Sequence, residues 1–571
     1  MTTHNREIAE RFDRLATLLE IEGSNPFRIR AYRNAARVIE GQGAQMSALL
    51  AEGKDLSELP GIGDDLAAKI ATLVESGELP LLEEVERRVP AELAEMTEIE
   101  GLGPKRVGQL YRELDIRSIE DLEQALEAGR VHELDGFGEK LEQSIRDGLE
   151  SLRDGEKRMR WADAEVIAEP LAEWLREIDG VKQVTLAGSY RRAKETVGDL
   201  DILVSCRKDS PVMDRFVEHE DVGRVVSHGT TRSTVHLRSG LQVDLRVVPE
   251  VSFGAALHYF TGSKAHNIAV RRRGVERGYK INEYGVYKDD DRIAGRTEEE
   301  VFESVDLPYI APELREDRGE IDAAEDDELP ELVTLEDLRG DLHSHTNATD
   351  GADDLESMAR AAAALGHEYL AVTDHSKAVR VANGLDADRL LEQVDAIERL
   401  NEEIDGITLL KGIEVDILDD GRLDLTDDVL ERLDIVVCSI HSRFNLSEKQ
   451  QTERVLRAMD NPNFNILAHP TGRLINRRQP YAIDLGQVVR AAAERGAILE
   501  VNAQPSRLDL DDRACLLARE HGVKIAISTD AHGTAQLENL RYGVNQARRG
   551  WLTADDVVNT RRLSELRKLL S

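Results

Sequence analysis

Residues 340–571 alternate regularly between short apolar runs and helical stretches, and this alternation limits the possible folds more than any other feature of the sequence. YLAVTDH (369–375) and AILEVNA (497–503) are typical apolar runs, and LGQVVRAAAERG (485–496) is a typical helical stretch. Strand patterns that alternate with helical patterns predict a parallel sheet whose strands are connected by helices. About seven such units follow one another, which predicts a β/α barrel.

Histidine and carboxylate side chains stand at or just after the end of nearly every predicted strand of this barrel. Taken alone, DLHSHTNATDG (341–351) is as compatible with an acidic surface loop as with the first ligands of a metal site. However, the carboxyl ends of barrel strands converge on one face, and of the eight histidines after residue 340 only His367 and His521 lie elsewhere. Nitrogen and oxygen ligands without thiolate suit Mn²⁺, Zn²⁺ or Fe²⁺. The predicted ligands are His343, His345, Asp350, His375, Glu414, His441, His469, Asp530 and His532.

Three segments in the first third of the chain share another pattern: a helix end, a tight turn through two glycines, and a new helix. They are ELPGIGDDLAAKI (58–70), EIEGLGPKRVGQL (98–110) and ELDGFGEKLEQSI (133–145). Such a turn exposes backbone N–H groups at a helix N-terminus, where a phosphate can bind. None follows a strand, which excludes a dinucleotide-binding turn. The pattern resembles the helix-hairpin-helix module, which holds the DNA backbone without reading bases, and the glycines expected to contact DNA are Gly61, Gly63, Gly101, Gly103, Gly136 and Gly138.

Between residues 155 and 250 strand follows strand, which predicts a mixed sheet. In GDLDILV, Asp199 and Asp201 are two residues apart, so both carboxylates leave the same face of a strand. Asp244, in LQVDLRVV, can add a third carboxylate from a later strand. Three converging acids favour a two-metal site for phosphoryl transfer with Mg²⁺ or Mn²⁺. The alternative is a solvated strand edge with alternating charge.

The context of these aspartates carries a family resemblance. AGSYRRAKETVGDLDI (187–202) resembles the nucleotidyltransferase signature, and HYFTGSKAHNIAVRRRG (258–274) is similar to the nucleotide-binding side of family X DNA polymerases. The resemblance implies that Asp199 and Asp201 bind both metals and that Asp244 positions the primer 3′-hydroxyl. It also implies dNTP contacts from a further set: Gly188, Ser189 and Arg192 at the triphosphate, Tyr259, Phe260 and Gly262 at the sugar, and Asn267 and Arg271 at the nascent base pair.

Lys69 matches the lysine with which some members of this family remove a 5′-deoxyribose phosphate. A lysine on a helix surface is more often only a solvated charge. In addition, Asp64 and Asp65 replace the basic residues often found beside that lysine, which would weaken binding of a 5′-phosphate. Lyase activity is therefore the less favoured interpretation of Lys69.

The barrel resembles the PHP (polymerase and histidinol phosphatase) domain at all nine ligand positions. The resemblance implies a distorted seven-stranded barrel with a trinuclear metal cluster that cleaves phosphoesters. It assigns His343, His345, Glu414 and Asp530 to one metal, Glu414, His441 and His469 to a second, and Asp350, His375 and His532 to the third. Soon after His469 come Arg473, Arg477 and Arg478, which we interpret either as a track for a DNA strand or as an ordinary basic loop.

The net charge of −37, from 74 Lys plus Arg against 111 Asp plus Glu, argues at first against a nucleic-acid partner. Adaptation to high salt is the other explanation, because charges are strongly screened there. Basic side chains are also clustered locally, for example in YRRAK (190–194) and VRRRGVER (270–277). The three scattered cysteines, the lack of a long apolar run and the polar N-terminus predict a cytoplasmic protein without membrane contact.

Together the resemblances cover nearly the whole chain and match the order of the bacterial and archaeal PolX architecture. We expect a multidomain protein with an all-α helix-hairpin-helix region, an α+β nucleotidyltransferase palm and a distorted (β/α)7 barrel. The expected domains are a lyase-like DNA-binding domain (1–80), a helical domain with two further hairpins (81–154), the palm (155–250), a nucleotide-selection subdomain (251–315), an acidic linker (316–337) and the PHP barrel (338–571).

The leading hypothesis is a monomeric DNA polymerase that fills short gaps, using gapped or primer-template DNA and dNTPs, coupled to a 3′→5′ exonuclease in the barrel. The resemblance also allows cleavage at abasic sites or of 3′-phosphates. One alternative is a small-molecule phosphatase fused to a nucleotidyltransferase, which the three glycine turns disfavour. Another is a DNA-binding scaffold with decayed sites, which the complete ligand sets disfavour.

Overall fold

The computed structural model describes the chain except residues 1–4, 41–45, 52, 60, 100, 139–140, 147–148, 150–157 and 571. It divides into two compact units, Met1–Lys157 and Arg158–Ser571, which are described separately. Among the described residues, no helix is long and apolar enough to cross a membrane.

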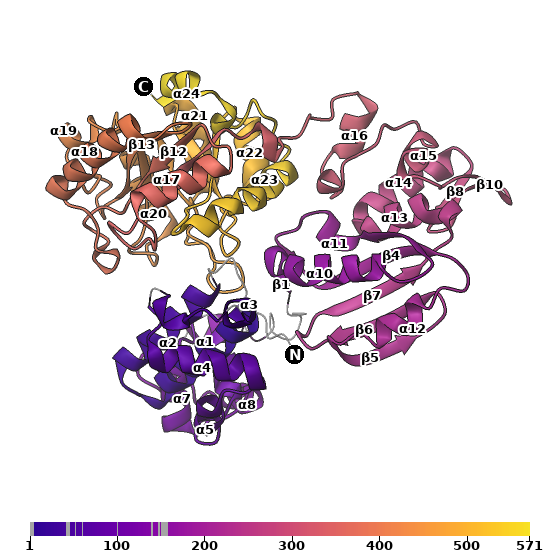
Figure 1. Ribbon diagram of the computed structural model, residues 1–571, viewed down its shortest axis with the longest axis horizontal. Coiled ribbons are helices and arrows are strands. Elements are labelled where there is room, and N and C mark those ends of the chain that lie inside the picture. The colour runs from indigo at the N-terminus through magenta and orange to yellow at the C-terminus, as the bar shows by residue number, and fades with distance from the viewer. Residues whose placement is uncertain are drawn as a thin grey trace. The chain divides into compact units, whose positions relative to one another are not determined.

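The first unit is all helical in its described part (indigo to purple in Figure 1). Its longest helix, α1 (Asn5–Glu22), carries Ile8, Phe12, Leu15 and Leu19 at spacings of three and four, so they share one face, and all four are buried in the core. The other helices complete that core: α2 (Pro26–Glu40), α3 (Met46–Ala51), α4 (Asp64–Ser76), α5 (Pro80–Glu86), α6 (Glu92–Glu95), α7 (Pro104–Leu114) and α8 (Ile119–Glu127).

The three glycine turns have the same backbone geometry. Gly61, Gly101 and Gly136 adopt φ values of 83°, 85° and 83°, a conformation that other residues rarely adopt. In each turn the second glycine accepts the first hydrogen bonds of the next helix; Gly63, for example, accepts from the N–H of Leu66 over 2.9 Å. The predicted repeat is therefore confirmed as three copies of one hairpin.

The second unit begins with the predicted mixed sheet, whose strand order is β2-β4-β7-β6-β5. Only the pair β4·β7 is parallel. The strands are β2 (Val181–Leu186), β4 (Asp199–Cys206), β5 (Val222–His228), β6 (Arg232–Leu237) and β7 (Gln242–Val247), and a short pair joins β1 (Met159–Arg160) to β3 (Thr196–Val197). The accompanying helices are α10 (Trp161–Arg176), α11 (Gly188–Arg191) and α12 (Val212–Val217).

A smaller α/β segment follows, at the right of Figure 1. It contains α13 (Phe253–Thr261), α14 (Lys264–Glu276), the strands β8 (Tyr279–Asn282), β9 (Gly285–Lys288) and β10 (Asp291–Ala294), and α15 (Glu298–Glu303). The predicted acidic linker is more ordered than its composition suggests. It forms helix α16 (Glu320–Glu325), where Glu320 is buried and accepts the 2.7 Å contact of His266 Nδ1 from α14.

The C-terminal part is the predicted barrel of seven parallel strands in chain order, shown in orange to yellow in Figure 1. Each predicted apolar run contains one strand: β11 (Gly340–Ser344), β12 (Tyr369–Val372), β13 (Thr408–Asp416), β14 (Ile435–Ser439), β15 (Ile466–Leu467), β16 (Ile498–Asn502) and β17 (Ile525–Ser528). A parallel bridge between Ser344 and Ala531 joins the ends of the series, so the barrel is nearly closed.

The strands of the barrel are connected and flanked by helices, as the alternating pattern predicts. They are α17 (Leu355–Ala364), α18 (Ala387–Glu403), α19 (Asp427–Leu430), α20 (Glu448–Ala458), α21 (Leu485–Arg495), α22 (Asp512–Glu520), α23 (Leu540–Arg549) and α24 (Leu563–Leu570). Strand residues such as Leu499 and Ile525 are fully buried and share one core cluster with helix residues such as Val489. This packing holds the carboxyl ends of the strands in fixed positions.

Candidate active sites

The mixed sheet brings the three predicted aspartates together. In the parallel pair β4·β7, Asp201 lies directly opposite Asp244, and Asp199 lies two residues away on β4. Burial and the charges of Asp199 and Asp244 raise the pKa of Asp201 to about 7. Crowded carboxylates of this kind fit divalent cations, which relieve the repulsion that opposes ionisation.

Asp244 is fixed by neighbours from the same sheet. It is 4% exposed, and Arg232 Nη2 and Gln242 Nε2 donate to its two oxygens over 3.1 and 3.2 Å, while the hydroxyl of Thr234 also donates to it. This orients the carboxylate beside Asp201 before any ligand arrives.

Gly188 has a specific steric role at this site. It follows β2 at φ 62°, and a Cβ atom added there would lie 2.8 Å from Asp201 Oδ2. A side chain at residue 188 would therefore displace one of the predicted metal ligands.

An open cleft of ≈ 620 Å³ runs past these aspartates. Its lining includes Asp199, Asp201 and every residue predicted to contact the dNTP: Gly188, Ser189, Arg192, Tyr259, Phe260, Gly262, Asn267 and Arg271. Sequence reasoning missed three cations that also line it, Arg158, Lys194 and Lys264. Arg158 lies in the basic stretch KRMR (157–160) and Lys194 in YRRAK (190–194), so clustering of positive charge was the usable signal.

Aromatic and cationic side chains are already paired in the cleft. Arg271 stacks on the Tyr259 ring, with its guanidinium carbon 4.9 Å from the ring centroid, and Arg246 lies 4.2 Å from the Phe260 centroid. Asn267 Nδ2 donates to the backbone oxygen of Tyr259 over 2.7 Å. The predicted sugar and base contacts thus form one connected wall.

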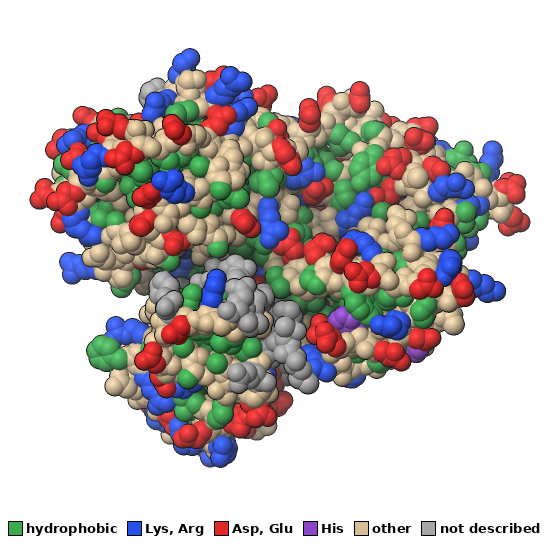
Figure 2. Space-filling view, in the orientation of Figure 1, with side chains coloured by type: hydrophobic (Ala, Val, Ile, Leu, Met, Phe, Trp, Pro, Cys, Tyr) green, Lys and Arg blue, Asp and Glu red, His purple; other side chains and the backbone are tan. Residues whose placement is uncertain are grey.

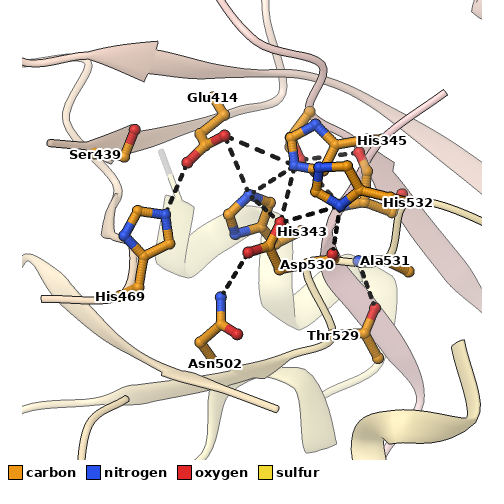
Figure 3. A network of polar contacts seen from close by, with 12 residues as sticks. His343, His345, Glu414, Ser439, His469, Asn502, Thr529, Asp530, Ala531 and His532 are labelled. Carbon is orange, nitrogen blue, oxygen red and sulfur yellow. Dashed lines mark hydrogen bonds and ion pairs between the residues drawn. The ribbon is translucent and has the colours of Figure 1, made fainter. Parts of the chain in front are cut away.

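The barrel gathers all nine predicted ligands at the carboxyl ends of its strands (Figure 3 labels His343, His345, Glu414, His469, Asp530 and His532). The Nε2 atoms of His343 and His345 lie 3.2 Å apart, and Asp530 Oδ1 lies 3.1 Å from His345 Nε2. Glu414 is the common neighbour on the other side, with its Oε1 3.0 Å from His469 Nε2 and 3.3 Å from His441 Nε2. Histidine nitrogen and carboxylate oxygen atoms that converge in this way fit shared metal ions.

The electrostatics of the cluster agree with this fit. Burial alone would raise the pKa of Glu414, yet His375, His441 and His343 hold it well below its ordinary value. The Asp530 pKa is lowered well below its usual range against burial, chiefly by His343 and His345. The centre therefore presents ionised, buried carboxylates, which are stable only beside positive charge.

The sets of residues that could hold one metal ion share more members than the family resemblance implies. His345 lies with Asp350, His375 and His532 in one group and with His343 and Asp530 in another, while His375 also joins Glu414 and His441. Each group contains at least three ligand atoms within 4.8 Å of one another. The fold therefore offers adjacent positions that share ligands.

Further carboxylates hold the imidazole rings from behind, and sequence reasoning missed them. His343 Nδ1 contacts Glu500 Oε1 at 2.8 Å, and His441 Nδ1 contacts Asp416 Oδ1 at 3.2 Å. Such contacts fix the ring orientation and tautomer of a metal-binding histidine. Asp416 lies two residues after Glu414 on β13, so period-two alternation was the available signal for it. Strand β16 carries none of the nine predicted ligands, so no such signal marked Glu500.

The structure shows which partners two other predicted residues, Arg473 and Lys69, have. Arg473 is too buried to contact a DNA strand along the surface. Its side chain is 12% exposed and pairs over 2.6 Å with Glu195, which belongs to the polymerase-like part of the chain. Lys69 forms an ion pair with Asp65, one turn earlier on α4.

Family models match along the chain in the order of these features. They are a helix-hairpin-helix domain (3–79), a SAM-like helix-hairpin-helix tandem (93–151), the DNA polymerase beta palm (158–246), the DNA polymerase beta thumb (256–316) and the PHP domain (341–504). The DNA polymerase/3′-5′ exonuclease PolX of Bacillus subtilis (strain 168) is 38% identical over 571 residues, which cover 99% of each chain. The chain belongs to the PolX family.

Other relatives match only part of the chain. A probable phosphatase of Thermoanaerobacter sp. (strain X514) is 32% identical over 231 residues, 38% of this chain and 89% of its own. A probable phosphatase of Acetivibrio thermocellus is 32% identical over 202 residues, 34% of this chain and 78% of its own.

Proposed function

We propose that this PolX family member fills short gaps in DNA at the three-carboxylate cleft and shortens 3′ ends in the barrel. The observation that carries the proposal is the coexistence, in one chain with three DNA-backbone hairpins, of the Asp199–Asp201–Asp244 cluster and a nine-residue metal centre. The Bacillus subtilis relative, named for both activities, supports the same pairing.

In the polymerase cleft, Asp199 and Asp201 would hold Mg²⁺ or Mn²⁺, and Asp244 would orient the primer 3′-hydroxyl toward the incoming phosphate. These cations would supply Lewis-acid activation of the attacking oxygen and neutralisation of the leaving pyrophosphate. Ser189 and Arg192 would bind the triphosphate, since an Arg fork matches phosphate oxygens. Tyr259 and Phe260 would wall the sugar and exclude a 2′-hydroxyl by bulk.

In the barrel, the nine ligands would hold a cluster of Mn²⁺, Zn²⁺ or Fe²⁺, which would supply an activated water and neutralise the phosphodiester. Glu500 and Asp416 would keep His343 and His441 in the orientation that binds metal. The resemblance to probable phosphatases keeps hydrolysis of small phosphoesters, or of 3′-phosphates, as a second candidate for the barrel.

The remaining partners follow from these roles. Gapped or primer-template DNA and dNTPs would be the substrates of a monomeric enzyme. Gly61, Gly63, Gly101, Gly103, Gly136 and Gly138 would contact the DNA backbone. Lys69 would give lyase activity only if a DNA 5′-phosphate displaced Asp65 from it.

The test uses a 5′-labelled primer in one-nucleotide-gapped DNA with Mn²⁺, with and without dNTPs. Asp199→Ala and His343→Ala are compared with the unaltered protein by product length on a gel. We expect extension to be lost only in Asp199→Ala and shortening only in His343→Ala. If shortening survives His343→Ala, the barrel acts on something other than the 3′ end, and small phosphoesters become its candidate substrates.

A further inference from the structure

The segment after helix α11 links the polymerase cleft to the barrel. Arg192, which lines the cleft, is only 9% exposed, and its Nε donates to Glu316 Oε1 over 3.0 Å. Its Nη1 donates to the backbone oxygen of Thr261 at the end of α13. In the described part of the chain Nη2 has no such partner, so this edge of the guanidinium group remains for a ligand.

Arg549, the last residue of barrel helix α23, holds both Arg192 and its carboxylate partner. Arg549 Nη1 donates to the backbone oxygen of Arg192 over 2.8 Å and lies 3.1 Å from Glu316 Oε1. Its Nη2 donates to Asp512 Oδ2, on barrel helix α22, over 2.5 Å. Arg549 is 3% exposed, so these contacts are shielded from water.

The charges in this network alternate. Although burial raises it, Arg192 and Arg549 hold the pKa of Glu316 below its ordinary value, so the carboxylate is ionised at neutral pH. Its charge is shared between two guanidinium groups. Removing one partner from a buried network leaves a poorly compensated charge, and without Arg549 the charge of Glu316 would act mainly on Arg192, with Lys194 as the remaining cationic neighbour.

We propose that Arg549 is a positioning residue for nucleotide binding: from the barrel, it keeps the Arg192 guanidinium placed and electrostatically available for the triphosphate of the incoming dNTP. The inference rests on the proposed function, in which Arg192 contacts that triphosphate. It makes the barrel a structural part of the polymerase site as well as the site of a second reaction.

The experiment measures one-nucleotide gap filling by full-length Arg549→Gln against dNTP concentration. Loss of one charge-assisted contact predicts a KM for dNTP about tenfold higher, with kcat changed less. Exonuclease activity on a single-stranded primer should be unchanged. Arg549→Lys, which retains the charge but not the guanidinium fork, should recover part of the loss.

Arg548→Gln is the matched control. Arg548 is the preceding residue of α23 and pairs with Glu313 over 2.8 Å, but it makes no contact with Arg192. The KM of Arg548→Gln for dNTP should equal that of the unaltered protein. If the contacts of α23 with Glu313 and Glu316 only stabilised the packing of the barrel, both variants would be affected alike.

Equal KM values for Arg549→Gln and the unaltered protein would overturn the inference. Arg192→Ala, measured beside them, separates the two levels of the argument. If Arg192→Ala leaves the KM unchanged, the nucleotide role of Arg192 in the proposed function is wrong. If only Arg192→Ala raises it, the role of Arg549 alone is wrong. Should Arg549→Gln not fold, Arg549→Lys takes its place: a smaller rise in the KM for dNTP is expected there, and an unchanged KM overturns the inference.

Discussion

Glu500 offers the sharpest test of how the barrel centre is organised. It is fully buried and accepts contacts from three directions: His343 Nδ1 at 2.8 Å, the backbone N–H of His469 at 2.7 Å and Asn502 Nδ2 at 3.2 Å. Two of these partners are predicted metal ligands. Replacing Glu500 with Gln keeps the shape of the side chain but removes the charge that orients the His343 ring.

Loss of a carboxylate behind a metal-binding histidine typically lowers metal affinity or activity by about 10- to 100-fold. For Glu500→Gln we therefore expect the Mn²⁺ concentration that gives half-maximal exonuclease activity to rise by about 10-fold or more. Gap filling should be unaffected, because the carboxylate cleft does not use this residue. Glu500→Ala should also destabilise the barrel by about 1–3 kcal/mol for each buried donor left without an acceptor.

The assay titrates Mn²⁺ against primer shortening, with unfolding followed in parallel. Glu494→Gln is the matched control, because Glu494 is exposed on α21. The reasoning is refuted if Glu500→Gln and Glu494→Gln show the same Mn²⁺ dependence and the same rate. In that case the contact with Glu500 would have no influence on how His343 binds metal.

Three further predictions concern stability, DNA and salt. Burial lowers the pKa of His367 to about 4, so on acidification the unfolded chain binds a proton at this residue before the folded chain does. The free energy of unfolding should therefore fall by at most about 3 kcal/mol as the pH drops from about 6.5 towards 4. Urea unfolding of His367→Gln should lack this contribution to the pH dependence. The second hairpin carries exposed Lys105 where the first carries Asp65, and exposed Arg106 follows it. Changing both cations to Gln should weaken DNA binding and reduce the slope of log K against log salt by about 2, whereas Asp65→Asn should not weaken it. Acidic side chains are scattered among basic ones on the visible face of the barrel in Figure 2. If they reflect adaptation to high salt, folding and gap filling should persist in about 1 M KCl. Loss of both at that concentration, with full activity at about 0.1 M, would contradict this explanation.

Local patterns predicted most of the fold because each depends on neighbours in sequence. Seven apolar runs became seven strands in order, and three glycine pairs became three identical turns. The aspartates of the cleft were also predictable, since Asp199 and Asp201 obey the period of a strand. Convergence of the nine barrel ligands followed from the rule that strand ends meet at one face.

Contacts between distant segments were not predictable in the same way. Arg549 and Arg192 are separated by 357 positions, and Arg473 and Glu195 by 278. Nothing in either local sequence marks such a pair, because an arginine that packs between two parts of the chain can have the same neighbours in sequence as an arginine that binds DNA. For the same reason the acidic segment 316–337 was expected to be only a linker, although Glu316 and Glu320 hold Arg192 and His266.

The basic clusters of this acidic chain divide into two classes once their partners are known. Arg191 pairs with Glu298, Arg273 with Glu325 and Arg277 with Asp306, so these guanidinium groups neutralise acids of the chain itself. The cleft is lined by five cations, of which Arg192 also pairs with Glu316: Arg158, Arg192, Lys194, Lys264 and Arg271. A triphosphate carries several negative charges into a chain of net charge −37, and only a local excess of positive charge can make that favourable. The intramolecular pairs therefore matter to function, because they leave the cleft as a place where basic side chains are gathered around space for a ligand.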